Sequence, residues 1–315
     1  MILAGIGRTW CPVCMTLPRY QKIDPGQTPY YHCVSRCVRR AYLCGYDTLS
    51  GRSFEHRRAW IEARLHRLAR IFAIDLCAYA VMSNHYHVVL RIDVHRLKAM
   101  SHEEVIDRWT RLHRLPEGFE SLSAFAQLVM IERWRSRLGS ISWFMKSINE
   151  PLARGANRED GCKGRFWEGR FRSQALLDEA AVLKCMVYID LNPVRAGIAS
   201  TPEDSLHTSV KARIEHRDNA LAPMAGERPT GFTLPIRRLD YIALVDATGR
   251  QWRLGRRGRI DPNLAPILAR LYPAGSWVDE LRHLTRRYCR AIGSIPSLLA
   301  YREALGQQRL RGLSA

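Results

Sequence analysis

Hydrophobic positions along the first third of the chain follow patterns that predict alternating strands and helices. Aromatic and β-branched residues over 30–38 predict a strand, and apolar residues at helical spacing predict a helix over 56–72. Residues 74–82 and 85–92 predict two more strands, joined by a two-residue turn as a hairpin. The apolar positions of the predicted helix are Ile61, Leu65, Leu68 and Phe72.

The middle of the chain is more polar and predicts mainly helices. Residues 94–140 are expected to form a helical insertion, which begins with the charged and irregular stretch 94–120. Two helical stretches over 122–150 are separated near Gly139. Residues 155–164 are predicted to form a polar loop.

One further strand and helix complete this pattern. Residues 172–177 predict a strand, and the helix that starts at Asp178 or Glu179 should end near Asn192, because Pro193 disfavours helical geometry in the residue before it. The order strand–helix–strand–strand–helix–strand–helix predicts an α+β fold. We expect a ferredoxin-like (RRM-like) antiparallel sheet with helices on one face.

The character of the sequence changes after Gly197. Residues 201–237 are rich in proline and polar residues and are predicted to be a linker, and 238–315 form a basic, mainly helical extension. Residues 1–29 are expected to be a lead-in, which leaves 30–200 as the central domain. Deleting 238–315 is expected to weaken binding to a polyanion and to leave the chemistry of the central domain intact.

The net charge of the chain indicates which class of partner it binds. Lys and Arg number 49 against 30 Asp and Glu, a net charge of +19, which favours a nucleic acid because neutralised phosphates release counterions. No apolar run is long enough for a transmembrane helix, and the start lacks the features of a secretion signal. The nine cysteines follow no disulfide pattern. A cytoplasmic protein without a membrane partner is expected.

Residues 84–90 contain two histidines separated by one residue. On a strand, His85 and His87 point to the same face, so their imidazoles can converge on one divalent metal ion. The alternative, that both merely lie on a hydrated face, is the commoner one for an isolated pair of this spacing.

A tyrosine and an asparagine lie four residues apart near the end of the last predicted helix. Tyr188 and Asn192 would share a helix face, so a phenol nucleophile and an amide ligand could act together. A phenol with a pKa near 10 is a weak nucleophile and needs activation. Taken alone, Tyr188 is more simply read as a core aromatic residue.

Taken together, these segments resemble the single-tyrosine HUH transposases, and especially the REP-associated tyrosine transposases. The resemblance spans roughly residues 18–200 and rests on the order, spacing and flanks of four segments. These are Tyr-His-Cys-Val-Ser-Arg at 31–36, Asn-His-Tyr-His-Val-Val-Leu at 84–90, Gly-Arg-Phe-Arg-Ser at 169–173, and Tyr-Ile-x-x-Asn-Pro-Val-x-x-Gly at 188–197.

This resemblance implies a metal-dependent endonuclease that acts on single-stranded or hairpin DNA. His85, His87 and Asn192 would hold Mg²⁺ or Mn²⁺, and Tyr188 would attack the phosphate, leaving a 5′-phosphotyrosine and a free 3′-OH that can be rejoined. Two alternatives remain open: a non-cutting DNA-binding protein or regulator of the same fold, and a phosphodiesterase that uses water while Tyr188 is structural.

Basic residues interleaved with aromatic residues predict a surface for single-stranded DNA. Cations alternate with aromatic rings over 163–172, and five arginines occur within 250–259. The alternative for the first segment is a hairpin whose phenylalanines, Phe166 and Phe171, belong to the core. The candidate DNA-binding residues, which include two arginines from the segments of the resemblance, are Arg36, Lys163, Arg165, Phe166, Trp167, Arg170, Arg172, Arg195, Arg253, Arg256 and Arg257.

Overall fold

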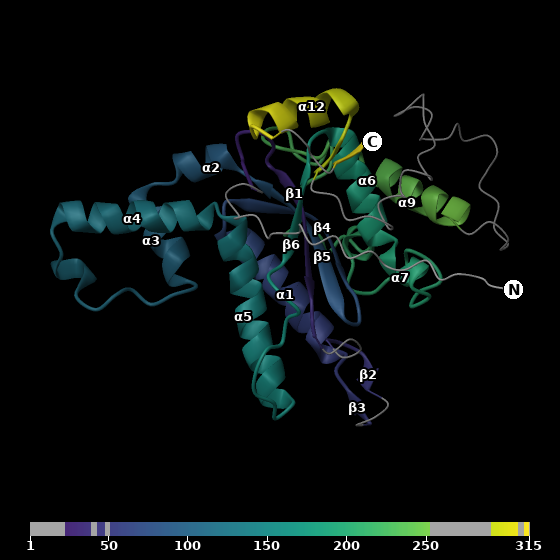
Figure 1. The fold of residues 1–315 in the computed structure, drawn as a ribbon, viewed down its shortest axis with the longest axis horizontal. Helices are drawn as coiled ribbons and strands as arrows, with labels where there is room; N and C mark the ends of the chain where they lie inside the picture. Colours follow the sequence, from purple (N-terminus) through teal and green to yellow (C-terminus); the bar gives the residue numbers. More distant parts are fainter. Residues whose placement is uncertain (1–22, 39–42, 48–50, 253–290, 308–311, 315) are drawn as a thin grey trace, which may run out of the picture.

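The structure, a computed structural model, describes residues 23–38, 43–47, 51–252, 291–307 and 312–314 (Figure 1). Its strands are β1 (Tyr30–Arg36), β2 (Tyr46–Asp47), β3 (Arg52–Ser53), β4 (Ile74–Val81), β5 (His85–Ile92), β6 (Arg172–Leu176), β7 (Ala291–Gly293) and β8 (Gly312–Ser314). Its helices are α1 (His56–Ile71), α2 (Val94–Ala99), α3 (His102–Thr110), the 3₁₀ turn η2 (Phe119–Ser121), α4 (Ala124–Leu138), α5 (Ile141–Glu159), α6 (Glu179–Asp190), α7 (Asn192–Arg195), α8 (Ser209–Ile214), α9 (Arg238–Trp252) and α12 (Ile295–Ala304).

Six strands form the main sheet, in the order β4-β5-β1-β6-β7-β8. The first four pair antiparallel, whereas β7 and β8 extend the edge beyond β6 in parallel. The order β4-β5-β1-β6 is the one that a strand–helix–strand–strand–helix–strand unit produces when both helices cross the same face. The predicted α+β class is therefore confirmed, and so are the strands and helix predicted up to residue 92, which differ only at their C-terminal ends.

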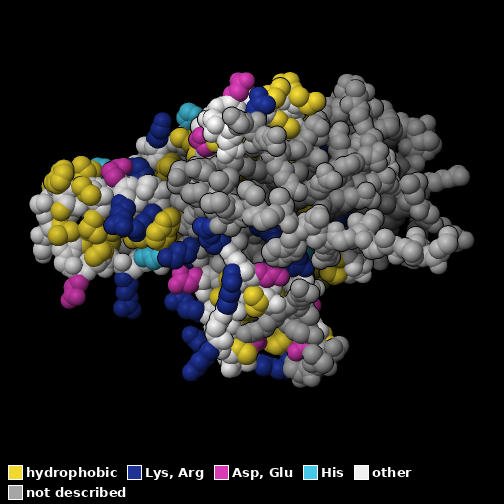
Figure 2. Space-filling view, viewed as in Figure 1, with side chains coloured by type: hydrophobic (Ala, Val, Ile, Leu, Met, Phe, Trp, Pro, Cys, Tyr) yellow, Lys and Arg dark blue, Asp and Glu magenta, His cyan; other side chains and the backbone are white. Residues whose placement is uncertain are grey.

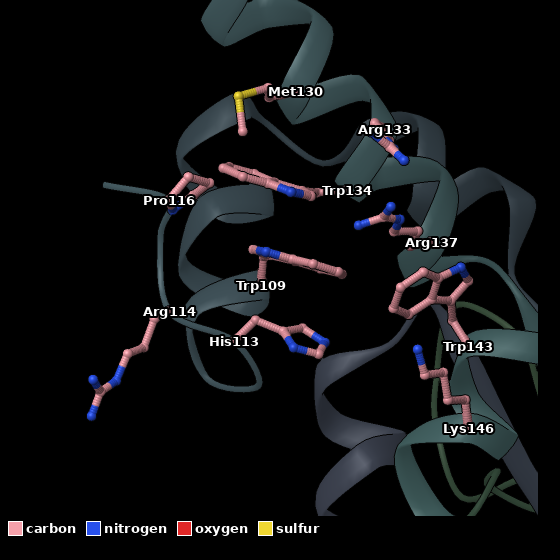
Figure 3. A pocket seen from close by; sticks show the side chains of 10 residues that line it. All are labelled: Trp109, His113, Arg114, Pro116, Met130, Arg133, Trp134, Arg137, Trp143 and Lys146. Carbon is pink, nitrogen blue, oxygen red and sulfur yellow. The ribbon is translucent and has the colours of Figure 1, made fainter. Parts of the chain in front are cut away.

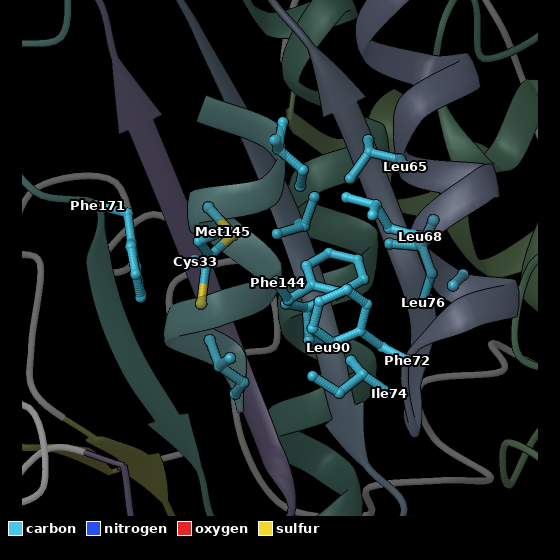
Figure 4. Close-up of a cluster of buried hydrophobic side chains, with 14 of the residues drawn as sticks. Cys33, Leu65, Leu68, Phe72, Ile74, Leu76, Leu90, Phe144, Met145 and Phe171 are labelled. Carbon is cyan, nitrogen blue, oxygen red and sulfur yellow. The ribbon is translucent and has the colours of Figure 1, made fainter. Parts of the chain in front are cut away.

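One face of the sheet is covered by α1 and α5. Their apolar side chains interdigitate with those of β1, β4 and β5 in a single buried cluster (Figure 4). The rings of Phe72 and Phe144 meet edge to face with 5.3 Å between centroids, which ties the end of α1 to α5. Representative members of this cluster are Cys33, Leu65, Leu68, Leu76, Leu90 and Met145.

The opposite face is covered as well, so the prediction of helices on one face only is wrong. Figure 1 shows α6 and α9 on the side of the sheet away from α1 and α5. There α6, α8 and α9 bury Cys77, Ala78, Ala80 and Val89 in a second cluster. The sequence of β4 could have indicated this, because a strand covered on both faces is apolar almost throughout. Seven of the eight residues of β4 are buried. Within the described ranges, no helix is both long and apolar enough to cross a membrane.

The helix α5 extends farther than predicted, into the expected polar loop at 155–164. It contains Pro151, which lacks the N–H that would bond the carbonyl of Ser147 one turn earlier. Arg64 on α1 donates its Nε–H to that carbonyl at 3.0 Å. The partner supplied by α1 satisfies the freed acceptor, and the helix continues to Glu159.

The segment predicted as a linker, 201–237, lies against the sheet. It contains α8, and the fully buried Arg213 donates to the carbonyls of Cys77 at 3.0 Å and Ala222 at 3.1 Å. The apolar residues of this segment contribute to the second cluster instead of facing solvent. The division of the chain into domains stays a prediction, but this segment is structured and packed.

The segment predicted as an extension, 238–315, also contributes to the core. Burial raises the pKa of Asp190, at the end of α6, to about 6. Its carboxylate accepts hydrogen bonds from Ser209 Oγ at 2.6 Å, Val210 N at 3.0 Å and Tyr241 Oη at 2.5 Å. Tyr241 belongs to α9, so removing 238–315 would expose the second cluster and leave Asp190 without one of its donors. We therefore revise the expectation that this deletion leaves the chemistry of the central domain intact, because it removes a donor that holds the end of α6.

Replacing Tyr241 by Phe tests the coupling between α9 and α6. The substitution removes the donor to the buried Asp190 carboxylate, so we expect the free energy of unfolding to fall by about 1.5–3 kcal/mol, the usual contribution of a hydrogen bond to a charged group. Urea denaturation measures it, with Tyr46→Phe as the control because Tyr46 is 63% exposed. Equal effects of the two substitutions would contradict the coupling.

Candidate active site

The two predicted histidines lie on β5, and the register of the sheet determines their neighbours. On β1, Arg36 lies opposite His85 and Val34 opposite His87, while Val34 also lies opposite Arg172 on β6. Residues directly opposite each other in antiparallel strands share a face. Both histidines and both arginines therefore lie on the face that α6 covers, and the imidazole centroids are 4.8 Å apart.

A third histidine, His32 on β1, completes this cluster. Its Nε2 lies 2.9 Å from Nδ1 of His87, and the two rings stack with 5.2 Å between centroids. Its Nδ1 lies 3.5 Å from Oε1 of Gln174, the residue opposite it on β6. His32 is part of the first segment of the resemblance, but nothing in the sequence assigned it or Gln174 a role.

This row of hydrogen bonds determines which nitrogen of His87 carries a proton. The amide oxygen of Gln174 only accepts, so His32 is protonated on Nδ1 and accepts on Nε2. His87 must then donate from Nδ1, which leaves a lone pair on its Nε2. That Nε2 is buried and has no hydrogen-bond partner in the described part of the chain.

His85 reaches the same state by a local contact. Its Nδ1 lies 2.5 Å from Oδ1 of Asn84, the preceding residue, which accepts its proton. The lone pair of His85 is therefore on Nε2 as well. Both imidazoles have the arrangement usual for a metal-ligating histidine, in which the second ring nitrogen is held by an outer hydrogen bond.

Burial keeps all three imidazoles neutral. It lowers the pKa of His32 and of His85 to about 4, and it lowers the pKa of His87 well below the ordinary value of 6.5. The positive charges of Arg36 and Arg195 add to the effect on the pKa of His87. Protonation of these rings therefore begins at a pH below 6.5, the value taken from an ordinary histidine.

Tyr188 faces this cluster from α6. It is the one residue of 181–190 that is not buried, and its ring centroid lies 5.9 Å from that of His87 and 6.3 Å from that of His32. The guanidinium of Arg195 lies over the phenol ring at 4.8 Å. Asp178 caps the start of α6 by accepting from Ala181 N at 2.8 Å. Tyr188 is thus a half-exposed phenol beside neutral imidazoles and a cation.

Asn192 lies one turn after Tyr188 but outside α6, which ends at Asp190, near the predicted end, and it is the first residue of the short helix α7. Its side chain is buried, and its Nδ2 has no hydrogen-bond partner among the described residues. No hydrogen bond in the described ranges joins Asn192 to either histidine of β5. A buried amide without a partner is costly unless a ligand or water occupies the space beside it.

The donor atoms at this site fit a divalent metal at His85 and His87. The unpaired, buried Nε2 of His87 and the neutral state of both rings are what a metal ligand requires. In the described part of the chain, however, no group of three or more His, Cys, Asp or Glu side chains is placed to share one ion. Asn192, whose amide oxygen can bind a divalent ion, stays the predicted third ligand.

The predicted DNA-binding residues fall into separate groups. Arg36, Arg172 and Arg195 lie on the face of the histidine cluster, and among the described residues Arg36 forms one long ion pair, with Glu168 at 3.8 Å. Lys163 and Arg170 are exposed in the loop before β6. Three predicted residues, Arg253, Arg256 and Arg257, lie outside the described residues.

The aromatic residues of the 163–172 segment face the wrong way for the predicted stacking. Phe166 is 2% exposed and Phe171 is 9% exposed, and both belong to the core between the sheet and α5. Trp167 is partly exposed, but its Nε1 donates to the carbonyl of Asn149 at 2.9 Å. Arg165 closes its own loop by donating to the carbonyl of Trp167 at 2.8 Å. The structure therefore supports the alternative for this segment, in which Phe166 and Phe171 belong to the core. Phe166 is not available to a base.

The pH dependence of stability tests the neutral state of the histidine row. Between pH 6.5 and about 4 the unfolded chain protonates His32 and the folded protein does not, so the free energy of unfolding falls as the pH falls. Each such group contributes up to about 1.4 kcal/mol per pH unit. We expect His32→Gln to reduce this slope by up to that amount in urea denaturation with chelator present. Identical slopes for the parent and the variant would show that His32 is protonated in the folded protein.

Comparisons with known proteins give a match to a solved structure. No model of a known protein family matches the chain, and no curated protein matches it. Among solved structures, a match is the "Structure of the REP associates tyrosine transposase bound to a REP hairpin", with 17% identity over 67% of this chain and 93% of that chain. Its TM-score of 0.36 is too low to establish a shared fold, so membership of that family stays a prediction.

Proposed function

We propose that this protein is a transposase-like endonuclease that cuts and rejoins single-stranded DNA through a covalent bond to Tyr188. The observation that carries the proposal is the position of the Tyr188 ring, 5.9 Å from His87, whose buried Nε2 has no partner among the described residues. A partly exposed phenol lies here beside an arginine that can hold a phosphodiester and beside neutral imidazoles that can hold an activating metal ion.

In the proposed step, Tyr188 Oη attacks phosphorus and the bond from phosphorus to the 3′ oxygen breaks. The phenol releases its proton to solvent water, and the leaving oxygen takes up a proton to become a 3′-OH. The product is a 5′-phosphotyrosine, which keeps the energy of the phosphodiester. Attack by a 3′-OH reverses the step, so joining needs no ATP.

A divalent ion, Mg²⁺ or Mn²⁺, held by His85, His87 and Asn192 would polarise the scissile phosphate and offset the charge on the leaving oxygen. The row from Gln174 through His32 to His87 fixes the ring of His87 and keeps its Nε2 unprotonated. The burial of His32 and His87 strengthens the electrostatic interactions of their rings.

The arginines around the cluster bind and orient the strand. Arg36, Arg172 and Arg195 place three positive charges on the histidine face, where a phosphate backbone would lie. A nucleophile fixed on a helix requires a backbone that bends to it, and single strands bend at little cost compared with a duplex. The proposed substrate is therefore single-stranded DNA, with a flanking hairpin as the resemblance implies.

Replacing Tyr188 by Phe tests the nucleophile. The variant lacks the attacking oxygen, so we expect the fold and DNA binding to persist and the covalent protein–DNA adduct to disappear, a loss of at least about a thousandfold in cleavage, as for other covalent nucleophiles. The assay follows a labelled oligonucleotide on a denaturing gel with Mn²⁺, and Tyr46→Phe is the control for the loss of an exposed phenol.

Three outcomes separate the alternatives. A Tyr188-dependent adduct on single-stranded DNA, lost when EDTA is added, supports the proposal. Cleavage without an adduct in the Tyr188→Phe variant would assign the attack to water. DNA binding by the parent protein without cleavage under any metal would leave a non-cutting DNA-binding protein or regulator.

A further inference from the structure

The helical insertion contains a cavity that the proposed chemistry does not use. It has a volume of about 420 Å³ and lies among α3, α4 and α5, where Trp109, Trp134 and Trp143 line it (Figure 3). This size is within the range of pockets that hold small organic ligands. Since α5 covers the face of the sheet opposite to α6, the cavity and Tyr188 lie on different sides of the sheet.

Aromatic rings form one wall of the cavity. Trp134 and Trp109 stack with an interplanar angle of 10° and 5.8 Å between centroids, and His113 follows Trp109 at 4.3 Å. The two stacked indoles are buried and serve as the core of the insertion. Trp143 and His113 are only partly buried, so these two rings are the ones in this wall that a base can reach from outside. His113 Nε2, moreover, is buried without a hydrogen-bond partner in the described ranges.

Four cations, Arg114, Arg133, Arg137 and Lys146, line the cavity together with Pro116 and Met130, and no acidic residue lines it. In the described part of the chain, no carboxylate forms an ion pair with Arg133, Arg137 or Lys146. Glu132, which precedes Arg133, is paired with Arg135, and Glu150, one helical turn after Lys146, is paired with Arg154. The guanidinium of Arg137 lies over the Trp143 ring at 4.2 Å, and Lys146 Nζ lies 4.8 Å from the same centroid.

The electrostatics of the cavity favour an anion. Burial and the neighbouring charge of Arg133 lower the pKa of Arg137, and burial with the charges of Arg137 and Lys146 lowers the pKa of His113. Positive groups held this close repel one another until an anion lies between them. Figure 2 shows Lys and Arg side chains over the helical insertion and beside it.

We propose that this cavity binds one nucleotide of a single-stranded nucleic acid, with the base against Trp143 or His113 and the flanking phosphates on Arg133, Arg137 and Lys146. A strand of nucleic acid supplies both an aromatic face and a negative charge at the spacing of one residue, which matches rings interleaved with cations. That the strand is DNA rests on the proposed function. Because the cavity lies on the other side of the sheet from Tyr188, it adds affinity without taking part in cleavage.

The double variant Arg133→Gln/Lys146→Gln tests the phosphate contacts. Both residues are exposed at their ends of the cavity, so the substitutions leave the Trp core in place. The control, Lys98→Gln/Arg158→Gln, removes the same number of charges from two other exposed residues that do not line the cavity. Binding of a labelled oligonucleotide of about ten thymidines, a length that single-strand grooves cover, is measured by anisotropy against salt in the Tyr188→Phe background.

We expect the cavity variant to reduce the slope of log K against log salt by about 1.4, for two phosphate contacts at about 0.7 each, and the control to leave it unchanged. Trp143→Leu should weaken binding by about tenfold or more through loss of base stacking. Photocrosslinking of an oligonucleotide with bromodeoxyuridine should label Trp143 or His113 in the parent chain, which reports on the site without relying on a variant that folds.

An equal fall in slope for the control, or crosslinks that avoid both rings, would overturn the proposal. The two proposals fail separately, because this assay measures binding and the Tyr188 assay measures a covalent adduct. Cavity-dependent binding without an adduct would leave this site standing and remove the nuclease. A covalent adduct together with DNA binding that does not depend on the cavity would support the nuclease and remove the proposed cavity site.

Discussion

The hydrogen bond between His32 and His87 is the interaction on which the site depends. It joins two buried imidazoles 55 residues apart in the chain, at 2.9 Å, in a region where neither ring can hold a charge at neutral pH. Only one arrangement of protons satisfies it together with the Gln174 oxygen, and that arrangement leaves a lone pair on Nε2 of His87. A buried nitrogen without a partner among the described residues is costly, and this is why we propose that His87 binds a ligand through Nε2.

The rest of the fold buries the row of hydrogen bonds from Gln174 to His87 and places Tyr188 beside it. Helices cover both faces of the sheet, so β4 is buried on both sides, and α6 places Tyr188 beside the histidines of β5. The end of α6 is held by the Asp190 carboxylate, whose three donors come from α8 and α9. Segments that looked like a linker and a tail are thus the support for the helix that carries the phenol, and their packing is coupled to the position of Tyr188.

The periodicity of apolar residues in the sequence predicted those features that depend on a single strand or helix. Alternation along 85–92 predicted both the strand and the common face of His85 and His87, and helical spacing predicted α1. It could not predict register, and register is what places Gln174 and Arg172 in the same rows as His32 and His87. Burial of Phe166 was equally out of reach, because interleaved aromatic and basic residues look alike on a DNA surface and in a hairpin that packs its rings inward. The Ser147 carbonyl shows the same limit, since Pro151 is tolerated only through a donor from another helix.

The protonation of the ring nitrogens is the most direct measurement of the central claim. Long-range ¹H–¹⁵N correlation spectra of histidine-labelled protein, recorded at neutral pH with chelator present, distinguish a protonated ring nitrogen from a bare one. The row of hydrogen bonds predicts that His32, His85 and His87 are all neutral with the proton on Nδ1 and a bare Nε2. A proton on Nε2 of His87, or a doubly protonated ring, would contradict the account, because that nitrogen could not then accept a metal ion beside Tyr188.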